Sequence, residues 1–175
     1  MARSPDKAAD VAAAASPEAP EPLTLERFLP YRLNVLATTV SNALARVYAE
    51  RFGLTIPQWR VLATLGQYER STARDIAAHT VMHKSTVSRA VSALAERGLL
   101  ERQPNAADMR EEMLALTGQG RGIYEALVPE ARAFERALAA ALSAQEEALL
   151  FTLIERLDAR MRALAPDLDL DGSGG

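Results

Sequence analysis

The residues best suited to molecular recognition lie on one face of the segment His83 to Arg97, which is predicted to be helical. Apolar residues recur there at helical spacing and define an inner face of Val87, Ala90, Val91 and Leu94. The opposite face combines cations with small hydroxyl residues: Lys84, Ser85, Ser88, Arg89 and Ser92, with Thr86 nearer the flank. Arginine and lysine can bind guanine edges or phosphates, and small hydroxyl residues permit close approach while donating hydrogen bonds. This pattern indicates contact with duplex DNA.

The elements around this segment favour the same interpretation. A short helix is predicted before it, because Thr72 and Asp75 form a capping-box signature. After Gly98 two short strands are predicted, Leu99 to Arg102 and Glu112 to Leu116, with a polar stretch between them. Short helix, turn, second helix and hairpin are the plan of a winged helix-turn-helix, whose second helix enters the major groove. Standing alone, the segment could equally be an amphipathic surface helix, so its place in this plan carries the prediction.

Helical periodicity also predicts the elements on either side. A long helix from Leu29 ends at Gly53, and a second helix follows Thr55 and stops near Gly66. Beyond the hairpin, Thr117 caps a helix running towards Leu142, in which Pro129 predicts a kink because it lacks an amide donor. The last helix opens at Ser143 and presents an apolar stripe of Leu150, Leu153, Leu157, Met161 and Leu164.

The composition suits one domain that is mostly α with a small β-hairpin wing. The chain has 175 residues, of which 49% are apolar and only 5% aromatic, a mixture that favours packed helices. Residues 1–22 and 166–175 are rich in small, proline or acidic residues and are predicted to be disordered tails, which leaves 23–165 as a single domain. Within this domain, residues 55–117 form the predicted winged helix-turn-helix.

Composition and charge also narrow the classes of function. The absence of cysteine excludes disulfides, thiolate metal ligands and cysteine-based peroxide sensing, and it fits a reducing cytoplasm. No apolar stretch is long enough to cross a membrane, and the alanine run near the start lacks the apolar character of a signal peptide. The formal charge is −3, yet residues 56–122 carry nine Lys and Arg against seven Asp and Glu. This local positive balance permits DNA binding without demonstrating it.

Residues 72–120 resemble the DNA-binding lobe of the MarR family of bacterial transcription regulators, and the similarity extends over residues 24–165. The motifs KSTVSR, ERGLLER, Asp-x-Arg and LT-x-x-G occur in the family's order and spacing. The resemblance implies that Arg110 enters the minor groove of DNA and that Asp108 braces it. A narrow minor groove has an enhanced negative potential that would attract the arginine. The family often has Asp-Arg-Arg here, whereas this chain has Met109 in the middle, so one basic contact is absent.

The resemblance further implies a homodimer joined by the flanking helices, residues 23–53 and 118–165. The apolar stripe of the last helix supplies suitable surface, although some of these residues must serve an intrachain core. A two-fold dimer would place its recognition helices one DNA turn apart, roughly 34 Å. We therefore expect a pseudopalindromic operator.

Small effectors commonly release MarR-like proteins from DNA, and six residues are candidates to bind one here: Tyr31, Arg32, Thr39, Arg46, Trp59 and Met82. Arg32 and Arg46 share one side of the first helix and lie about 21 Å apart, so they could hold an extended anionic ligand. Residues 29–62 also resemble regulators of aromatic catabolism, including those that respond to hydroxycinnamoyl-CoA thioesters. This resemblance implies a repressor released by an aromatic acid or an aryl-CoA thioester. Surface salt bridges for the arginines, and core packing for Trp59 and Met82, are the alternatives.

Two other classes of function find less support. The sequence has no Gly-rich phosphate loop and no Ser/His/Asp arrangement, so we predict neither an enzyme nor a cofactor site. His79 and His83 would have metal-ligand spacing only on one helix, and the turn predicted between them makes us expect no metal site. A winged-helix interaction module that has lost DNA binding would not need both Arg89 and Arg110.

Overall fold

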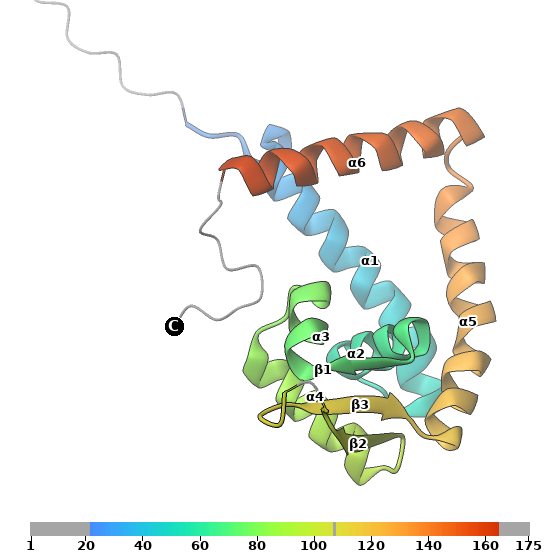
Figure 1. The fold of residues 1–175 in the computed structure, drawn as a ribbon. Helices are drawn as coiled ribbons and strands as arrows, with labels where there is room; N and C mark the ends of the chain where they lie inside the picture. Colours follow the sequence, from blue (N-terminus) through green and yellow to red (C-terminus); the bar gives the residue numbers. More distant parts are fainter. Residues whose placement is uncertain (1–21, 107, 165–175) are drawn as a thin grey trace, which may run out of the picture. The chain divides into compact units, whose positions relative to one another are not determined.

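The computed structural model describes residues 22–106 and 108–164, in two compact units that divide after Leu36. The tails predicted at residues 1–22 and 166–175 lie outside the described residues, apart from residue 22. Along the chain the elements are η1 (Leu25–Arg27), α1 (Leu29–Phe52), α2 (Ile56–Tyr68), β1 (Arg70–Thr72), α3 (Ala73–Thr80), α4 (Lys84–Glu96), β2 (Leu100–Pro104), β3 (Glu112–Leu116), α5 (Gly118–Ala139) and α6 (Ala144–Leu164). The fold is mostly helical with a small sheet (Figure 1), which confirms the predicted fold class.

The sheet contains one strand that sequence patterning missed. Its three strands are antiparallel in the order β1-β3-β2. The predicted hairpin pairs from Leu100 opposite Leu116 to Pro104 opposite Glu112. The added strand β1 pairs Ser71 with Leu114, on the other edge of β3. It has only three residues, too few to show an alternating pattern, and it exists because β3 offers an unpaired edge.

The hydrophobic core lies among α2, α3, α4 and the sheet. Large apolar side chains from each of these elements are fully buried, including Leu62, Leu65, Ile76, Leu94 and Leu114. Removal of this surface from water is the main force that holds the unit together. The first residues of α2 and α3 are well defined, because Thr55 and Thr72 each form a complete capping box there. The predicted helix start at Thr72 is confirmed.

Two glycines serve tight packing rather than helix termination. The prediction that the second helix stops near Gly66 holds to within two residues, because α2 ends at Tyr68. A Cβ at Gly66 would overlap the ring of Tyr124 on α5, so this glycine lets the ring approach the α2 backbone. Gly120, in the first turn of α5, faces the main-chain carbonyl of Leu99 in the same way. By contrast, Gly98 follows the end of α4 and adopts a left-handed φ of +68°, as predicted for the residue that ends the segment His83 to Arg97.

The long helix α6 is exposed along its length. None of its residues is buried, and its large apolar side chains are 39% to 58% exposed. The preceding helix α5 passes through Pro129 as one continuous element. Among the described residues, no single helix has the length and apolarity to cross a membrane; α5 and α6 meet those criteria only as a pair, which is bent by 104°.

Candidate DNA interface

The N-terminus of α4 is fixed by a histidine cap. The ring Nδ1 of His83 accepts a hydrogen bond from the main-chain N–H of Ser85 at 3.2 Å and lies 2.7 Å from the Ser85 hydroxyl. This bond satisfies one of the amides that the first helical turn leaves without a partner. The cap therefore defines where α4 begins and holds its first turn.

The faces of α4 are those that the sequence predicted. Val87, Val91 and Leu94 are buried to 2% exposure or less, which fixes the rotation of the helix. The opposite face is exposed at four of the predicted DNA-contacting positions: Lys84, Ser85, Ser88 and Arg89. Thr86 is half-buried, in keeping with its place on the flank. The helix thus presents cationic and hydroxyl groups to solvent in the arrangement that contact with DNA requires.

Ser92 has a different environment from the other predicted contacts. It is half-buried, and its hydroxyl accepts a hydrogen bond from the guanidinium of Arg102 on β2 at 3.3 Å. Arg102 in turn pairs with Glu112 at 2.8 Å. Ser92 therefore joins α4 to the hairpin, a role that its helical position did not reveal.

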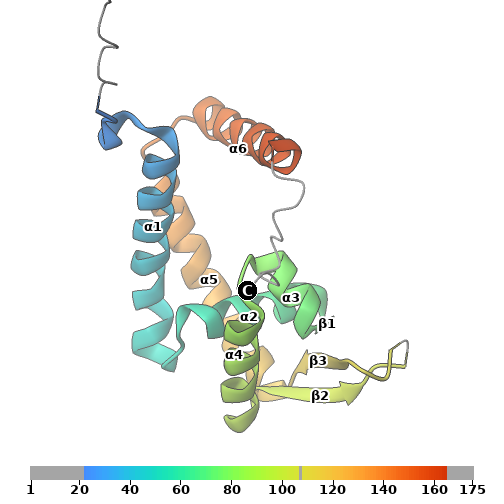
Figure 2. The ribbon, with the colours of Figure 1, turned by 90° about the vertical axis from the view of Figure 1, so that its left-hand side faces the viewer.

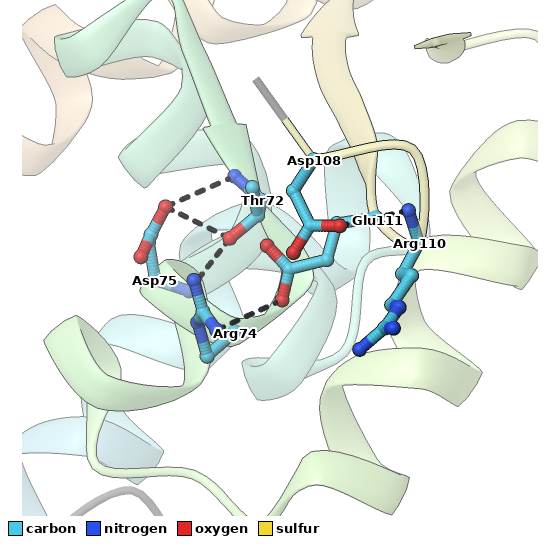
Figure 3. Close-up of polar contacts among 6 residues, drawn as sticks. All are labelled: Thr72, Arg74, Asp75, Asp108, Arg110 and Glu111. Carbon is cyan, nitrogen blue, oxygen red and sulfur yellow. Dashed lines mark hydrogen bonds and ion pairs between the residues drawn. The ribbon is translucent and has the colours of Figure 1, made fainter. Parts of the chain in front are cut away.

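The hairpin β2–β3 is the wing, and Figure 2 shows it extending to one side of α4. At its tip the main-chain N–H of Arg110 donates to Oδ1 of Asp108 at 3.0 Å. Asp108 thus braces the backbone at Arg110, and Figure 3 shows the guanidinium pointing away from this carboxylate. The side chain of Arg110 is exposed and available to an external partner.

Two surface hollows bring the helix and its neighbours together. Ser88 and Arg110 line a hollow of about 320 Å³ with Arg74 and Arg102, so the wing and α4 share one concave surface. A second hollow of about 250 Å³ joins Thr86 and Arg89 of α4 to the N-terminus of α2. The convergence of cations on the first hollow was not predicted, because Arg74 and Arg102 come from α3 and β2.

One of the effector candidates, Trp59, belongs to an aromatic pair. Its ring stacks on Tyr48 with centroids 5.4 Å apart and planes 21° from parallel. Burial raises the pKa of Tyr48, and the nearby charge of Arg60 partly opposes this shift. Trp59 also lines a hollow of about 240 Å³ with Arg60, Gln67, His79 and Thr80. The sequence did not identify Tyr48 as a member of this pair, because Tyr48 is on α1 whereas Trp59 is on α2.

The remaining effector candidates are divided between the two units. Tyr31 and Arg32 are exposed in the unit that ends at Leu36, whereas Thr39 and Arg46 are exposed in the unit that also contains Trp59. Their assembly into one site stays a prediction. Met82 is only 6% exposed and packs within the hydrophobic core, as the core alternative expects.

The two histidines do not share a helix. α3 ends at Thr80, Val81 adopts a left-handed φ of 51°, and His83 caps the following helix. The spacing that would place two ligands on one helical face therefore does not apply. Within residues 22–106 and 108–164, no group of three or more potential metal ligands is present.

The short helix α3, the turn, α4 and the β2–β3 hairpin together make a winged helix-turn-helix, a class of DNA-binding domain. The sequence model that describes the MarR family matches residues 52–111 of this chain. A MarR family transcriptional regulator from Silicibacter pomeroyi DSS-3 is 30% identical, with a TM-score of 0.66, and the match covers 78% of this chain and 99% of that one. The chain therefore belongs to the MarR family of DNA-binding transcription regulators, and it is not an enzyme.

Two further solved structures share this fold. PcaV of Streptomyces coelicolor, solved in complex with its natural ligand, is 26% identical, with a TM-score of 0.65 over 79% of this chain and 96% of that one. BpsR of Bordetella bronchiseptica, whose DNA binding is regulated by 6-hydroxynicotinic acid, is 22% identical, with a TM-score of 0.61 over 73% of this chain and 98% of that one. The likeness to BpsR is one of fold.

Proposed function

We propose that the protein is a homodimeric, ligand-responsive repressor that binds a pseudopalindromic operator through α4 and the wing. The observation that carries the proposal is the shared hollow of Ser88 and Arg110, which aligns the exposed face of α4 with the wing arginine. A helix of this kind suits the major groove, while an arginine on a wing suits the adjacent minor groove. Such a regulator would act in the cytoplasm, where bacterial DNA lies.

The proposal is tested by a mobility-shift assay of the purified protein on the DNA upstream of its own gene. We expect a retarded complex that survives competition by unrelated duplex DNA and that dissociates with one member of a panel of aromatic acids and aryl-CoA thioesters. If unlabelled unrelated duplex competed for the protein as well as unlabelled upstream DNA does, sequence-specific binding would be contradicted.

Replacement of Arg89 with alanine should weaken operator binding by about 1–3 kcal/mol, because a bidentate contact to a base edge is lost. Folding should change little, since the side chain is exposed. Fluorescence anisotropy on operator duplexes measures the loss, with Arg70→Ala at an exposed position of β1 as the control. Equal affinities of Arg89→Ala and the parent for the operator would remove Arg89 from base reading.

Replacement of Arg110 with alanine should weaken binding most where an A·T-rich sequence flanks the half-site, because a narrow minor groove attracts the guanidinium most strongly. The measurement compares parent and variant on two operators that differ only in this flank. The variant should lose the parent's preference between them. If both proteins discriminate equally, Arg110 does not occupy the minor groove.

The dimer is supported by the apolar surface that the single chain leaves uncovered. The stripe on α6 is exposed from Leu150 to Leu164, and the unit that ends at Leu36 exposes further leucines and aromatic residues. An exposed apolar stripe such as that on α6 marks an interface. We propose that residues 23–53 and 118–165 of two copies cover it.

An acidic aromatic effector is supported by the chemistry of the candidate residues and by related proteins. PcaV was solved in complex with its natural ligand, and the DNA binding of BpsR is regulated by 6-hydroxynicotinic acid, which is an aromatic acid. Here α1 carries Arg32 and Arg46 on one continuous helix, and Trp59 offers an aromatic surface. A thioester of CoA would bring phosphates for the arginines and an aryl group for the aromatic surface.

The variants Arg32→Ala and Arg46→Ala should bind the operator as the parent does and yet need more effector for release. An effector shifts the equilibrium only through its different affinities for the two states, so a weaker ligand contact lowers sensitivity alone. Calorimetry with the effector found in the mobility-shift panel measures this change. Arg51→Ala is the control, because Arg51 on the same helix pairs with Glu130 at 2.7 Å. Parent-like effector affinity in both variants would make these arginines structural.

A further inference from the structure

Two arginines outside the predicted interface face the same hollow as Ser88 and Arg110. Arg74 comes from the first turn of α3 and Arg102 from β2, and both line this hollow of about 320 Å³. Each is paired with a carboxylate near the tip of the wing, where β3 begins. Nη1 of Arg74 lies 3.3 Å from Oε1 of Glu111 (Figure 3), and Nη1 of Arg102 lies 2.8 Å from Oε2 of Glu112.

The carboxylates of the wing and of the first turn of α3 differ in what they do for the fold. Oδ2 of Asp75 accepts hydrogen bonds from the hydroxyl of Thr72 at 2.8 Å and from its main-chain N–H, so Asp75 caps α3. Asp108 is engaged by the main chain at Arg110. Glu111 and Glu112, by contrast, direct their carboxylates at arginine side chains. Their main effect is thus on the charge of the hollow.

The Arg102–Glu112 pair is open to solvent, and the Arg74–Glu111 pair is open on its arginine side. The side chains of Arg74 and Glu111 are 59% and 22% exposed, and those of Arg102 and Glu112 are 41% and 54% exposed. Exposed pairs contribute little to folding stability. A guanidinium has five N–H donors, so each paired arginine retains donors for a second anion.

We propose that Arg74 and Arg102 contact the phosphates of bound DNA, and that Glu111 and Glu112 act as built-in counterions that weaken binding to DNA of any sequence. A phosphate that approaches either arginine also approaches a carboxylate. It must either displace this carboxylate from the arginine or bind against its electrostatic repulsion. The net positive charge that the hollow offers to DNA is therefore smaller than its three arginines suggest. This inference rests on the proposed use of α4 and the wing, and it adds a control of affinity that does not depend on base sequence.

The test is the double variant Glu111→Gln/Glu112→Gln, bound to duplex DNA of random sequence and followed by fluorescence anisotropy between 50 and 200 mM salt. The variant should bind more tightly at low salt. Its logarithmic salt dependence should steepen by about 0.9 for each arginine released from its carboxylate, which amounts to about a tenfold larger change in affinity over this range. Thermal unfolding verifies that the variant is folded.

A matched control separates counterion pairing from a general change in charge. Glu96→Gln/Glu101→Gln removes the same two charges from the end of α4 and from β2, where Glu101 is bonded to Gln103 instead of an arginine. It should change affinity less than twofold. An equal gain in the control and the test variant would overturn the proposal, as would unchanged or weaker binding by the test variant.

A second set of variants tests the arginines themselves. Arg74→Ala/Arg102→Ala should weaken binding to random-sequence DNA. When the two glutamine substitutions are added to this variant, affinity should not change further, because the arginines that Glu111 and Glu112 pair with are already absent. If the glutamine substitutions raised DNA affinity as much without the two arginines as with them, the proposed counterion role of Glu111 and Glu112 would be overturned. Failure of the proposed interface would show differently, as Arg89→Ala and Arg110→Ala variants that bind the operator like the parent.

Discussion

Replacement of Gly120 with alanine is expected to destabilise the winged helix-turn-helix by about 3 kcal/mol, at the upper end of the range for over-packing. The added Cβ would overlap the carbonyl oxygen of Leu99, which is main chain and cannot rotate away. That carbonyl also accepts from the main-chain N–H of Thr117 at 3.2 Å, and Leu100 then pairs with Leu116. A shift of the backbone here would strain both the start of α5 and the base of the wing.

Urea denaturation followed by circular dichroism measures this loss, and Gly122→Ala is its matched control. Gly122 lies in the same helix, and a Cβ there would meet nothing within 4 Å. Alanine at this position should stabilise the protein by about 0.5–1 kcal/mol, because glycine has greater backbone freedom in the unfolded chain. If the two variants show the same stability, the close approach of Gly120 to Leu99 does not constrain the fold.

The second large effect is expected on assembly. Leu157→Asp should weaken the proposed dimer by about 3 kcal/mol, or about a hundredfold, because a charge would be buried in an apolar interface. In the single chain Leu157 is 39% exposed, so the variant should fold as a monomer. Sedimentation equilibrium measures the dimer, and affinity for a full palindrome should fall with it, since one subunit then reads one half-site.

Ala159→Asp provides the control, because it adds the same charge to α6 on the side opposite the apolar stripe. It should remain dimeric at the concentrations where Leu157→Asp dissociates. A folded Leu157→Asp monomer that still bound the full palindrome as tightly as the parent would show that the dimer on α6 is not what binds the operator.

Sequence alone determined the features of this protein that arise within a few residues of the chain. Helical periodicity located the inner face of α4 correctly, because neighbouring turns of one helix decide which side chains lie together. The start of α3 followed from Thr72 and Asp75, whose side chains bond to each other's main-chain N–H groups. The hairpin followed from two short strand-like segments on either side of a polar stretch. The resemblance to the MarR family added the roles predicted for Asp108 and Arg110.

Tertiary structure decided what depends on partners far apart in the chain. Strand β1 forms because residues 70–72 meet β3 more than forty positions later. The ring of Tyr124 packs where a Cβ at Gly66 would lie, so the need for glycine there depends on α5. Ser92 and Arg102 meet only when β2 packs on α4, and Arg74 meets Glu111 only when the wing folds back towards α3. Local patterning carries no information on such meetings, because the core and the sheet register set the distances between those side chains.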